Sequence, residues 1–211
     1  MITFFYVRHG TTKGNTEFRL IGNAESPLTE TGIQNAEDAA KALIDIPFTH
    51  AFYSPLSRAK DTAKTVLKYH PPVKETPLEE LIEWHFGKYE YLVHPTHREE
   101  VDSRLAKGDF SDVGGETRAG FHARIREGFR EMLEELEDGE TVLIGSHGFF
   151  YIEMLEAIFG KEVRDEYMKD KKSVCPVPNG GISVFEYDGE KFRMKQFAAS
   201  PVGWNYAEAG K

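Results

Sequence analysis

Two short apolar segments, residues 2–7 and 141–144, each lead into a turn that contains a His-Gly pair. The first ends at Arg8-His9-Gly10, and the second is followed closely by His147-Gly148. Apolar runs that end abruptly in such turns are typical of buried strands that lead into functional loops. In open α/β sheets, ligands bind beyond the carboxyl ends of the strands. We therefore expect both His-Gly pairs to lie around one crevice.

Helical patterns alternate with strand patterns along the rest of the chain. Apolar residues at helical spacing begin after a Thr29 cap and end before Pro47, and they are spaced as one stripe over residues 116–137. Further helices are expected from Ser54-Pro55 to Pro71 and over 149–159, and further strands are expected over 51–53 and 73–78. The last two strands, over 182–187 and 192–198, are expected to form a terminal hairpin. This alternation predicts an α/β fold, a three-layer α/β/α sandwich with a mostly parallel central sheet.

The length and composition of the chain indicate a single globular domain. Its 211 residues are fewer than the roughly 250 at which single cores tend to split. We expect one domain over residues 1–211, with an insertion at 79–115 whose part 88–115 caps the site and selects the substrate. No apolar run approaches the roughly 20 residues that span a bilayer. The single cysteine, Cys175, excludes an internal disulfide, so a cytoplasmic location is expected.

The charge balance limits the partners. A formal net charge of -9 argues against nucleic-acid binding, which needs a basic face to displace counterions from phosphates. An acidic protein can still bind a small anion if a few arginines gather in one pocket. Arg8 directly precedes the first His-Gly pair, and a guanidinium offers planar, bidentate donors to phosphate oxygens. We therefore expect a small phosphorylated metabolite as ligand, with no cofactor, metal, nucleic acid or membrane. The oligomeric state is left open.

Arg8-His9-Gly10 resembles the signature of the histidine phosphatase superfamily, whose fold is that of phosphoglycerate mutase. Further landmarks follow in the order of that family over residues 1–150. They are Thr12, Asn15, Arg19, Gly22, Pro27-Leu28-Thr29, Gly32, Ser54-Pro55-Leu56-Ser57-Arg58-Ala59, Leu81-Ile82-Glu83, Phe86-Gly87, Gly115-Glu116-Thr117 and Ser146-His147-Gly148. The resemblance implies a phosphomonoesterase that works through a phosphohistidine.

The resemblance also assigns roles to individual residues. His9 would be the nucleophile, and Arg8, Arg58 and a protonated His147 would form a positive clamp around the transferring phosphoryl group. Glu83 would protonate the leaving oxygen, with its pKa raised if its apolar neighbours shield it. Glu79 and Glu80 lie close to it in the sequence and remain alternatives. Contacts to substrate or phosphate are implied for Asn15, Gly22 and Gly148.

Three positions depart from the family pattern and leave the substrate open. Thr11 stands where many relatives have Glu, Tyr89-Glu90-Tyr91 replaces a Trp-Glu-Gly, and a histidine often found near Ser200-Pro201 is missing. A 2,3-bisphosphoglycerate-dependent mutase would share the fold, but its adjacent arginine pair does not occur here. The hydrolase is therefore favoured over the mutase.

Two other classes of function remain as alternatives. An inactive regulatory protein of the same fold would have lost the nucleophile or an arginine, whereas all five catalytic positions are present. A metallohydrolase would need some of the remaining histidines as ligands, and their spacing fits no metal motif. Those histidines are His50, His70, His85, His94, His97 and His122.

Overall fold

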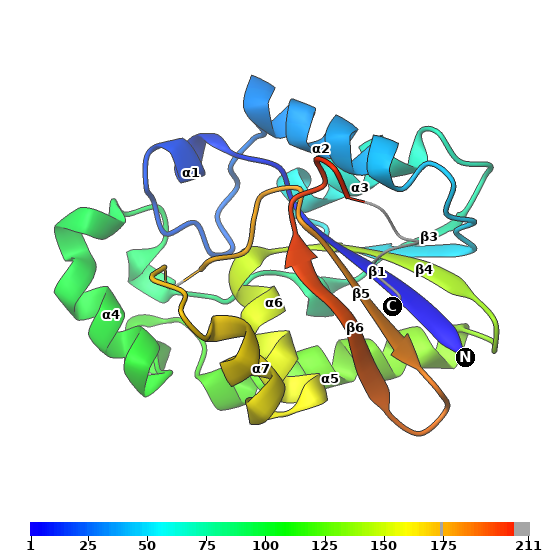
Figure 1. Ribbon diagram of the computed structural model, residues 1–211. Coiled ribbons are helices and arrows are strands. Elements are labelled where there is room, and N and C mark those ends of the chain that lie inside the picture. Colours follow the sequence, from blue (N-terminus) through cyan, green and yellow to red (C-terminus); the bar gives the residue numbers. More distant parts are fainter. Residues whose placement is uncertain (174, 205–211) are drawn as a thin grey trace.

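A six-stranded sheet forms the centre of the computed structural model, which describes residues 1–173 and 175–204 and, for residues 94 and 95, the backbone alone (Figure 1). The strands are β1 (Ile2–Arg8), β2 (His50–Tyr53), β3 (Lys74–Pro77), β4 (Thr141–Ser146), β5 (Ile182–Tyr187) and β6 (Phe192–Ala199), in the order β3-β2-β4-β1-β5-β6. The first four are mutually parallel, while β5 is antiparallel to β1 and pairs with β6 as a hairpin. The predicted α/β fold and its terminal hairpin are confirmed.

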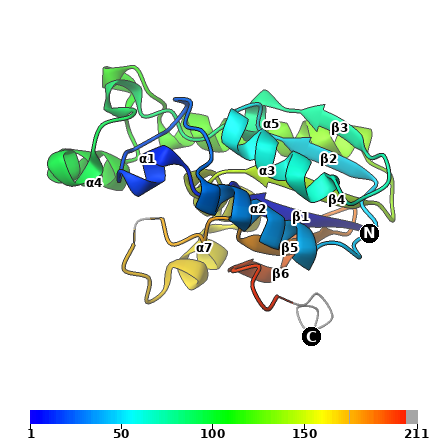
Figure 2. The same ribbon diagram turned by 90° about the horizontal axis from the view of Figure 1, so that it is seen from above.

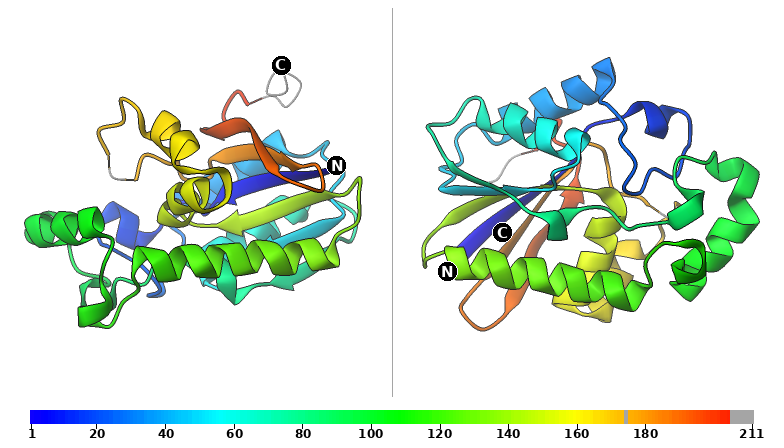
Figure 3. Two further views of the ribbon diagram at one scale, coloured as in Figure 1. Left: turned by 90° about the horizontal axis from the view of Figure 1, so that it is seen from below. Right: turned by 180° about the vertical axis from the view of Figure 1, so that it is seen from behind.

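Helices cover both faces of the sheet (Figures 2 and 3). On one face lie α2 (Glu30–Ala42) and α3 (Ser57–Leu67), and on the other lie α5 (Arg118–Glu135) and α6 (Gly148–Met154). Successive side chains of a strand point to opposite faces. Phe4 and Tyr6 accordingly join the core under α5, and Phe5 joins the core under α2 and α3. Strand β1 is thus buried on both sides, as its continuous apolar sequence predicts.

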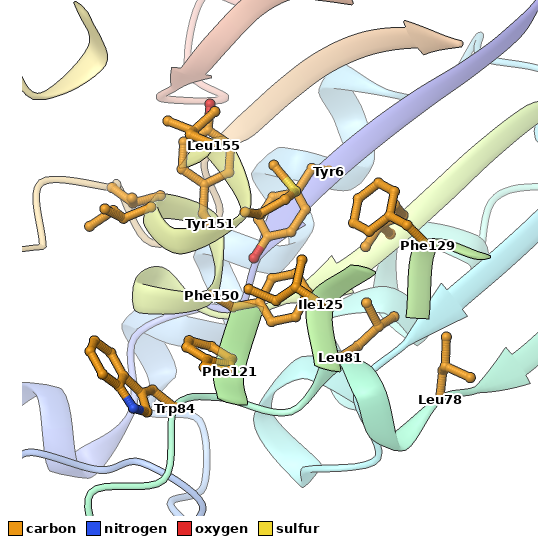
Figure 4. Packing of buried hydrophobic residues seen from close by; sticks show 14 of the residues in the cluster. Tyr6, Leu78, Leu81, Trp84, Phe121, Ile125, Phe129, Phe150, Tyr151 and Leu155 are labelled. Atoms are coloured by element: carbon orange, nitrogen blue, oxygen red, sulfur yellow. The ribbon is translucent and has the colours of Figure 1, made fainter. Parts of the chain in front are cut away.

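The core under α5 and α6 is rich in aromatic residues (Figure 4). Phe121, Ile125 and Phe129 form the predicted apolar stripe of α5, and each is at most 2% exposed. Phe121 packs edge-on against Phe150 of α6, with ring centroids 5.9 Å apart. Burial of each such side chain stabilises the fold by roughly 1.5–3 kcal/mol. This packing fixes the start of α6 relative to the sheet, and the candidate site lies at that start.

The loops at the carboxyl ends of the parallel strands carry short helices that the sequence patterns do not predict (Figure 1). Helix α4 was missed because only Val101 and Leu105 of its ten residues are buried, so its apolar stripe is too narrow. The elements are α1 (Lys13–Thr16), η1 (Glu79–Leu81), η2 (Gly87–Tyr89), η3 (His94–His97), α4 (Arg98–Lys107) and η4 (Ser111–Val113).

Other boundaries also differ from those predicted. Helix α3 begins at Ser57 rather than at Ser54, since the Ser54 N–H continues the pairing with β4 by donating to Gly145 O at 2.9 Å and Leu56 still has a non-helical ψ of 130°. Helix α6 continues as a π-helical turn, η5 (Leu155–Phe159), and the following α7 (Lys161–Met168) was not predicted. The Thr29 cap is confirmed, since its side chain accepts a hydrogen bond from the Gly32 N–H. Within the part of the chain described, none of the helices has both the length and the apolar character that a membrane crossing requires.

Candidate active site

The two His-Gly pairs lie side by side, as expected. Strands β1 and β4 are parallel neighbours with Arg8 opposite Ser146, so the residues that follow them emerge at the same edge of the sheet. The ring centroids of His9 and His147 are 5.3 Å apart. The parallel pairing of these strands therefore brings together two imidazoles that are far apart in the sequence.

His9 is held in the protonation state that a nucleophile needs. Its Nδ1 lies 2.7 Å from Gly10 O, and because a carbonyl only accepts, Nδ1 carries the proton and donates it. Burial, and then the positive charges of Arg58 and Arg8, hold the pKa of His9 well below its usual range. The ring is therefore neutral near pH 7, and Nε2 keeps a free lone pair.

Two arginines beside His9 have hydrogen-bond donors to spare. Arg58 donates from Nη1 to Ala24 O at 2.8 Å and from Nη2 to Gly22 O at 2.6 Å, and Arg8 donates to Val177 O. The Nε atoms of both arginines are buried without a partner among the described residues. Burial lowers the pKa of Arg58 to about 10, so it stays charged at neutral pH. A buried and a partly buried guanidinium group, each with a buried Nε that lacks a partner among the described residues, mark this corner as a candidate anion site.

Glycine is required at two of the predicted contact positions. Gly22 has a φ of +57°, and a Cβ there would collide with the Glu90 carboxylate. A Cβ on Gly148 would lie 2.5 Å from Cys175 Sγ and 3.0 Å from Arg8 Nε, so only glycine lets the start of α6 approach this guanidinium. Both positions keep the walls of the site close to the arginines.

Asn15 lies at the edge of the same cavity. Its Oδ1 accepts hydrogen bonds from the backbone N–H and the hydroxyl of Thr12, at 3.0 and 3.1 Å. This capping interaction leaves the Asn15 Nδ2 as the group that can donate to a ligand.

His147 is the predicted third member of the positive clamp. It is fully buried, it does not line the cavity, and its Nε2 lies 2.8 Å from Ser54 Oγ. Burial, followed by the charge of Arg58, holds the pKa of His147 well below its usual range. The free site therefore favours the neutral ring, whereas the prediction of a protonated His147 concerns the site with a phosphoryl group bound. A bound phosphoryl dianion would raise this pKa, because an opposite charge favours the imidazolium.

Glu83 lies at the start of α6, where three backbone N–H groups meet its carboxylate. Oε1 accepts from the N–H groups of Trp84 at 3.0 Å and Phe150 at 2.7 Å, and Oε2 accepts from that of Phe149 at 3.0 Å. Burial nevertheless raises the pKa of Glu83, because desolvation outweighs these hydrogen bonds and the charge of Arg58. Of the three candidate carboxylates, Glu83 lines the cavity, whereas Glu79 and Glu80 do not.

The cavity at these residues has a volume of about 190 Å³ and an apolar side that the sequence motifs did not reveal. Leu105 comes from α4, and Phe18 lies in the turn that follows α1. The signal in the sequence that could have identified this apolar side is the cluster Phe18, Leu20 and Ile21, which lies in a loop. The apolar lining residues are Phe18, Leu20, Ile21, Phe86, Leu105 and Phe149, and the cavity also reaches Arg19 and Cys175.

The remaining histidines are scattered over different elements. His122 lies nearest to a possible ligand set, since its ligand atom and those of Glu153 and Glu156 all lie within 4.8 Å of one another. Glu153, however, already accepts hydrogen bonds from both His122 and Arg118, which leaves it little capacity for a cation. The side chain of His94 lies outside the described residues.

Comparison with known proteins identifies relatives that match about two thirds of the chain. Adenosylcobalamin/alpha-ribazole phosphatase of Salmonella typhimurium is 34% identical over 145 residues, 67% of this chain and 71% of that protein. The 2,3-bisphosphoglycerate-dependent phosphoglycerate mutase 2 of Gloeobacter violaceus is 31% identical over 156 residues, 70% of this chain and 71% of that protein.

Solved structures show the same fold. Bacillus stearothermophilus YhfR matches with a TM-score of 0.80 and 25% identity, over 93% of this chain and 96% of that chain. A family model described as the histidine phosphatase superfamily (branch 1) matches residues 4–200, which include every candidate site residue. With this match, the paired histidines and the two arginines beside them at the edge of the sheet have a common explanation, and the chain belongs to the histidine phosphatase superfamily.

Proposed function

We propose that this protein hydrolyses a small phosphomonoester through a phosphohistidine on His9. The observation that carries the proposal is the neutral His9 ring. Its Nδ1 is fixed by Gly10 O, and its neighbours are the buried Arg58 and the partly buried Arg8, whose Nε atoms are buried without a partner among the described residues. A neutral nitrogen beside fixed positive charge is the arrangement that phosphoryl transfer to an imidazole requires.

In the first step, His9 Nε2 attacks phosphorus, and the bond from phosphorus to the ester oxygen breaks. The leaving oxygen takes a proton from Glu83, which becomes a carboxylate stabilised by the N–H groups of Phe149 and Phe150. Arg8 and Arg58 stabilise the negative charge on the non-bridging oxygens. In the second step, the Glu83 carboxylate deprotonates a water that attacks the phosphohistidine, which releases phosphate and restores both groups.

The relatives do not agree on a substrate, so none is carried over to this chain. Their names cover an alpha-ribazole phosphatase, a phosphoglycerate mutase and a fructose-2,6-bisphosphatase. The role of residues 88–115 as a cap stays a prediction, supported by the place of Leu105 in the cavity lining. A screen of phosphomonoesters with the purified protein is the direct test of the proposed activity.

The products formed from one substrate distinguish a phosphatase from a mutase. With 3-phosphoglycerate and catalytic 2,3-bisphosphoglycerate, we expect inorganic phosphate to be released much faster than 2-phosphoglycerate forms. The reason is that the chain lacks an adjacent arginine pair for the substrate carboxylate. Phosphate release and isomerisation are measured in the same reaction by phosphorus NMR. Dominant isomerisation would reverse the proposal in favour of the mutase.

A further inference from the structure

The cavity at His9 is divided into a cationic floor and an apolar wall. Arg8, His9 and Arg58 form the floor, where the phosphoryl group is proposed to bind. The wall consists of Phe18, Leu20, Ile21, Phe86, Leu105 and Phe149. Phe86 and Phe149 pack edge to face with ring centroids 5.5 Å apart, so this part of the wall is firmly packed.

Two distant segments are paired to build this wall. Leu20 N–H donates to Leu92 O at 2.9 Å, and Tyr91 N–H donates to Leu20 O at 2.6 Å. Phe18 and Tyr91 have φ values of 54° and 63°, a left-handed conformation that side chains other than glycine seldom adopt. Phe18 is also 69% exposed at the cavity. Backbone strain and an exposed aromatic ring both cost stability, and their coincidence at the site indicates a ligand contact.

The charge of the third arginine at the cavity is already offset by a carboxylate. Arg19 donates from Nη1 to Tyr91 O at 2.7 Å and pairs through Nε with Glu17 Oε2 at 2.5 Å. Its guanidinium also lies over the Tyr91 ring, 4.9 Å from the centroid. Among the described residues that line the cavity, the other cationic groups belong to the floor. A carboxylate or second phosphate on the substrate would therefore meet either apolar side chains or an arginine already paired with Glu17, and would gain little from this wall.

We propose that the site selects phosphomonoesters whose alcohol part is apolar, and aromatic in particular, over those that carry a carboxylate or a second phosphate. This inference rests on the proposed function. The phosphoryl group binds the floor, while the alcohol part contacts the wall and gains from removal of apolar surface from water. Phe18 covers the alcohol part of the substrate from the edge of the cavity.

The test compares esters of similar alcohol basicity, so that the chemistry of the leaving group does not decide the result. We expect kcat/KM for 2-phenylethyl phosphate to exceed that for glycerol 3-phosphate and for 3-phosphoglycerate by about tenfold or more, chiefly through KM. Phe18→Gly removes the ring, and glycine adopts the left-handed backbone of this position without strain. This variant should reduce the ratio several-fold. Tyr69→Ala removes another exposed aromatic residue, remote from the cavity lining, and should leave the ratio unchanged.

The outcomes separate this inference from the proposed function. If no ester is hydrolysed and no phosphoenzyme forms, the proposed function fails. If the esters are hydrolysed but 3-phosphoglycerate equals or exceeds 2-phenylethyl phosphate, the inference alone is overturned. A ratio that Phe18→Gly leaves intact would likewise exclude Phe18 from substrate selection.

A separate set of contacts concerns Arg124 of α5, which holds the segment that carries Glu83. Nη1 donates to Glu80 O at 3.0 Å and to Ile82 O at 2.9 Å, and Nη2 donates to Glu83 O at 3.1 Å. The remaining two N–H groups donate to the Glu116 carboxylate, from Nε to Oε1 at 2.9 Å and from Nη2 to Oε2 at 2.8 Å. A guanidinium has five N–H donors, and all five are used here. We infer that Arg124 is a positioning residue for the proton donor Glu83.

This second inference predicts a loss that depends on the leaving group. Arg124→Met should slow hydrolysis of an alkyl phosphate roughly ten- to hundredfold, because a displaced Glu83 protonates the alkoxide poorly. A nitrophenyl phosphate needs little protonation and should lose much less. Arg130→Met removes an exposed arginine of the same helix and serves as the matched control. If Arg124→Met does not fold, Glu116→Gln, which weakens the same contacts, should give the same pattern. Equal losses on both substrates in either folded variant would overturn the positioning role.

Discussion

His9→Ala is expected to abolish both turnover and formation of the phosphoenzyme. The variant keeps Arg8 and Arg58 and still binds phosphate, but it has no nitrogen in place to form the bond to phosphorus. The expected loss in kcat is roughly 10⁴- to 10⁶-fold, as found when the nucleophile of a catalytic unit is removed. The phosphoenzyme is measured by quenching the reaction of a substrate labelled in its phosphoryl group. In the wild type, the label that stays on the protein should be released by acid and retained in base.

The control for this variant is a histidine elsewhere in the fold. His70 packs against Phe48, with ring centroids 5.0 Å apart, and does not line the cavity. His70→Ala should therefore retain catalysis, and thermal unfolding of both variants shows whether the fold is kept. An acid-labile phosphoenzyme in folded His9→Ala protein would rule out His9 as the nucleophile.

Glu83→Gln is expected to lower kcat/KM for alkyl phosphates by roughly two to four orders of magnitude while sparing much of kcat/KM for a nitrophenyl phosphate. An alkoxide is a strong base and needs a proton as it leaves, whereas nitrophenolate leaves as a stable anion. The proposed role of Glu83 in activating water follows release of the alcohol and is common to both substrates, so it lowers kcat and lets the variant accumulate phosphoenzyme. Values of kcat/KM for both substrates, measured beside the wild type, therefore give the selectivity directly.

The pH profile gives a second readout for Glu83. Burial raises the pKa of this carboxyl group, so the protonated form persists to higher pH than in an exposed glutamate. For an alkyl ester, kcat/KM should then fall as pH rises through this raised pKa, because the proton donor is lost. At the acid end, activity should fall only well below the usual histidine range, since the pKa of His9 is lowered. The alkaline decrease should be absent in Glu83→Gln.

Glu80→Gln is the matched control for Glu83→Gln, since Glu80 lies three residues away in the chain and outside the cavity lining. It should leave both substrates near the wild-type rate. An alkyl-selective defect in Glu80→Gln, or an equal loss with both substrates in Glu83→Gln, would mean that the wrong carboxylate has been assigned.

The elements that could be predicted are those with strong local patterns. Strand β1 is apolar on both faces, and α5 carries one continuous stripe, so periodicity alone identifies them. Helix α4 buries only two residues, and its helical form depends on contacts with other segments. The start of α3 depends on a hydrogen bond from Ser54 to Gly145 of β4, a contact with a distant strand that a local pattern cannot contain.

The sequence by itself determined the chemistry of the site. Arg8, His9, Arg58 and His147 stand in motifs at strand ends and a helix start, and parallel topology brings such positions to one edge of a sheet. The tertiary structure alone decided the directions of the pKa shifts and the shape of the cavity. Burial and the charge of Arg58 lower the pKa of His147, and burial raises that of Glu83, because burial and nearby charges come from segments that are distant in the sequence. The apolar wall likewise exists only in the folded chain, because Phe18 and Leu105 come from segments that are far apart in the sequence.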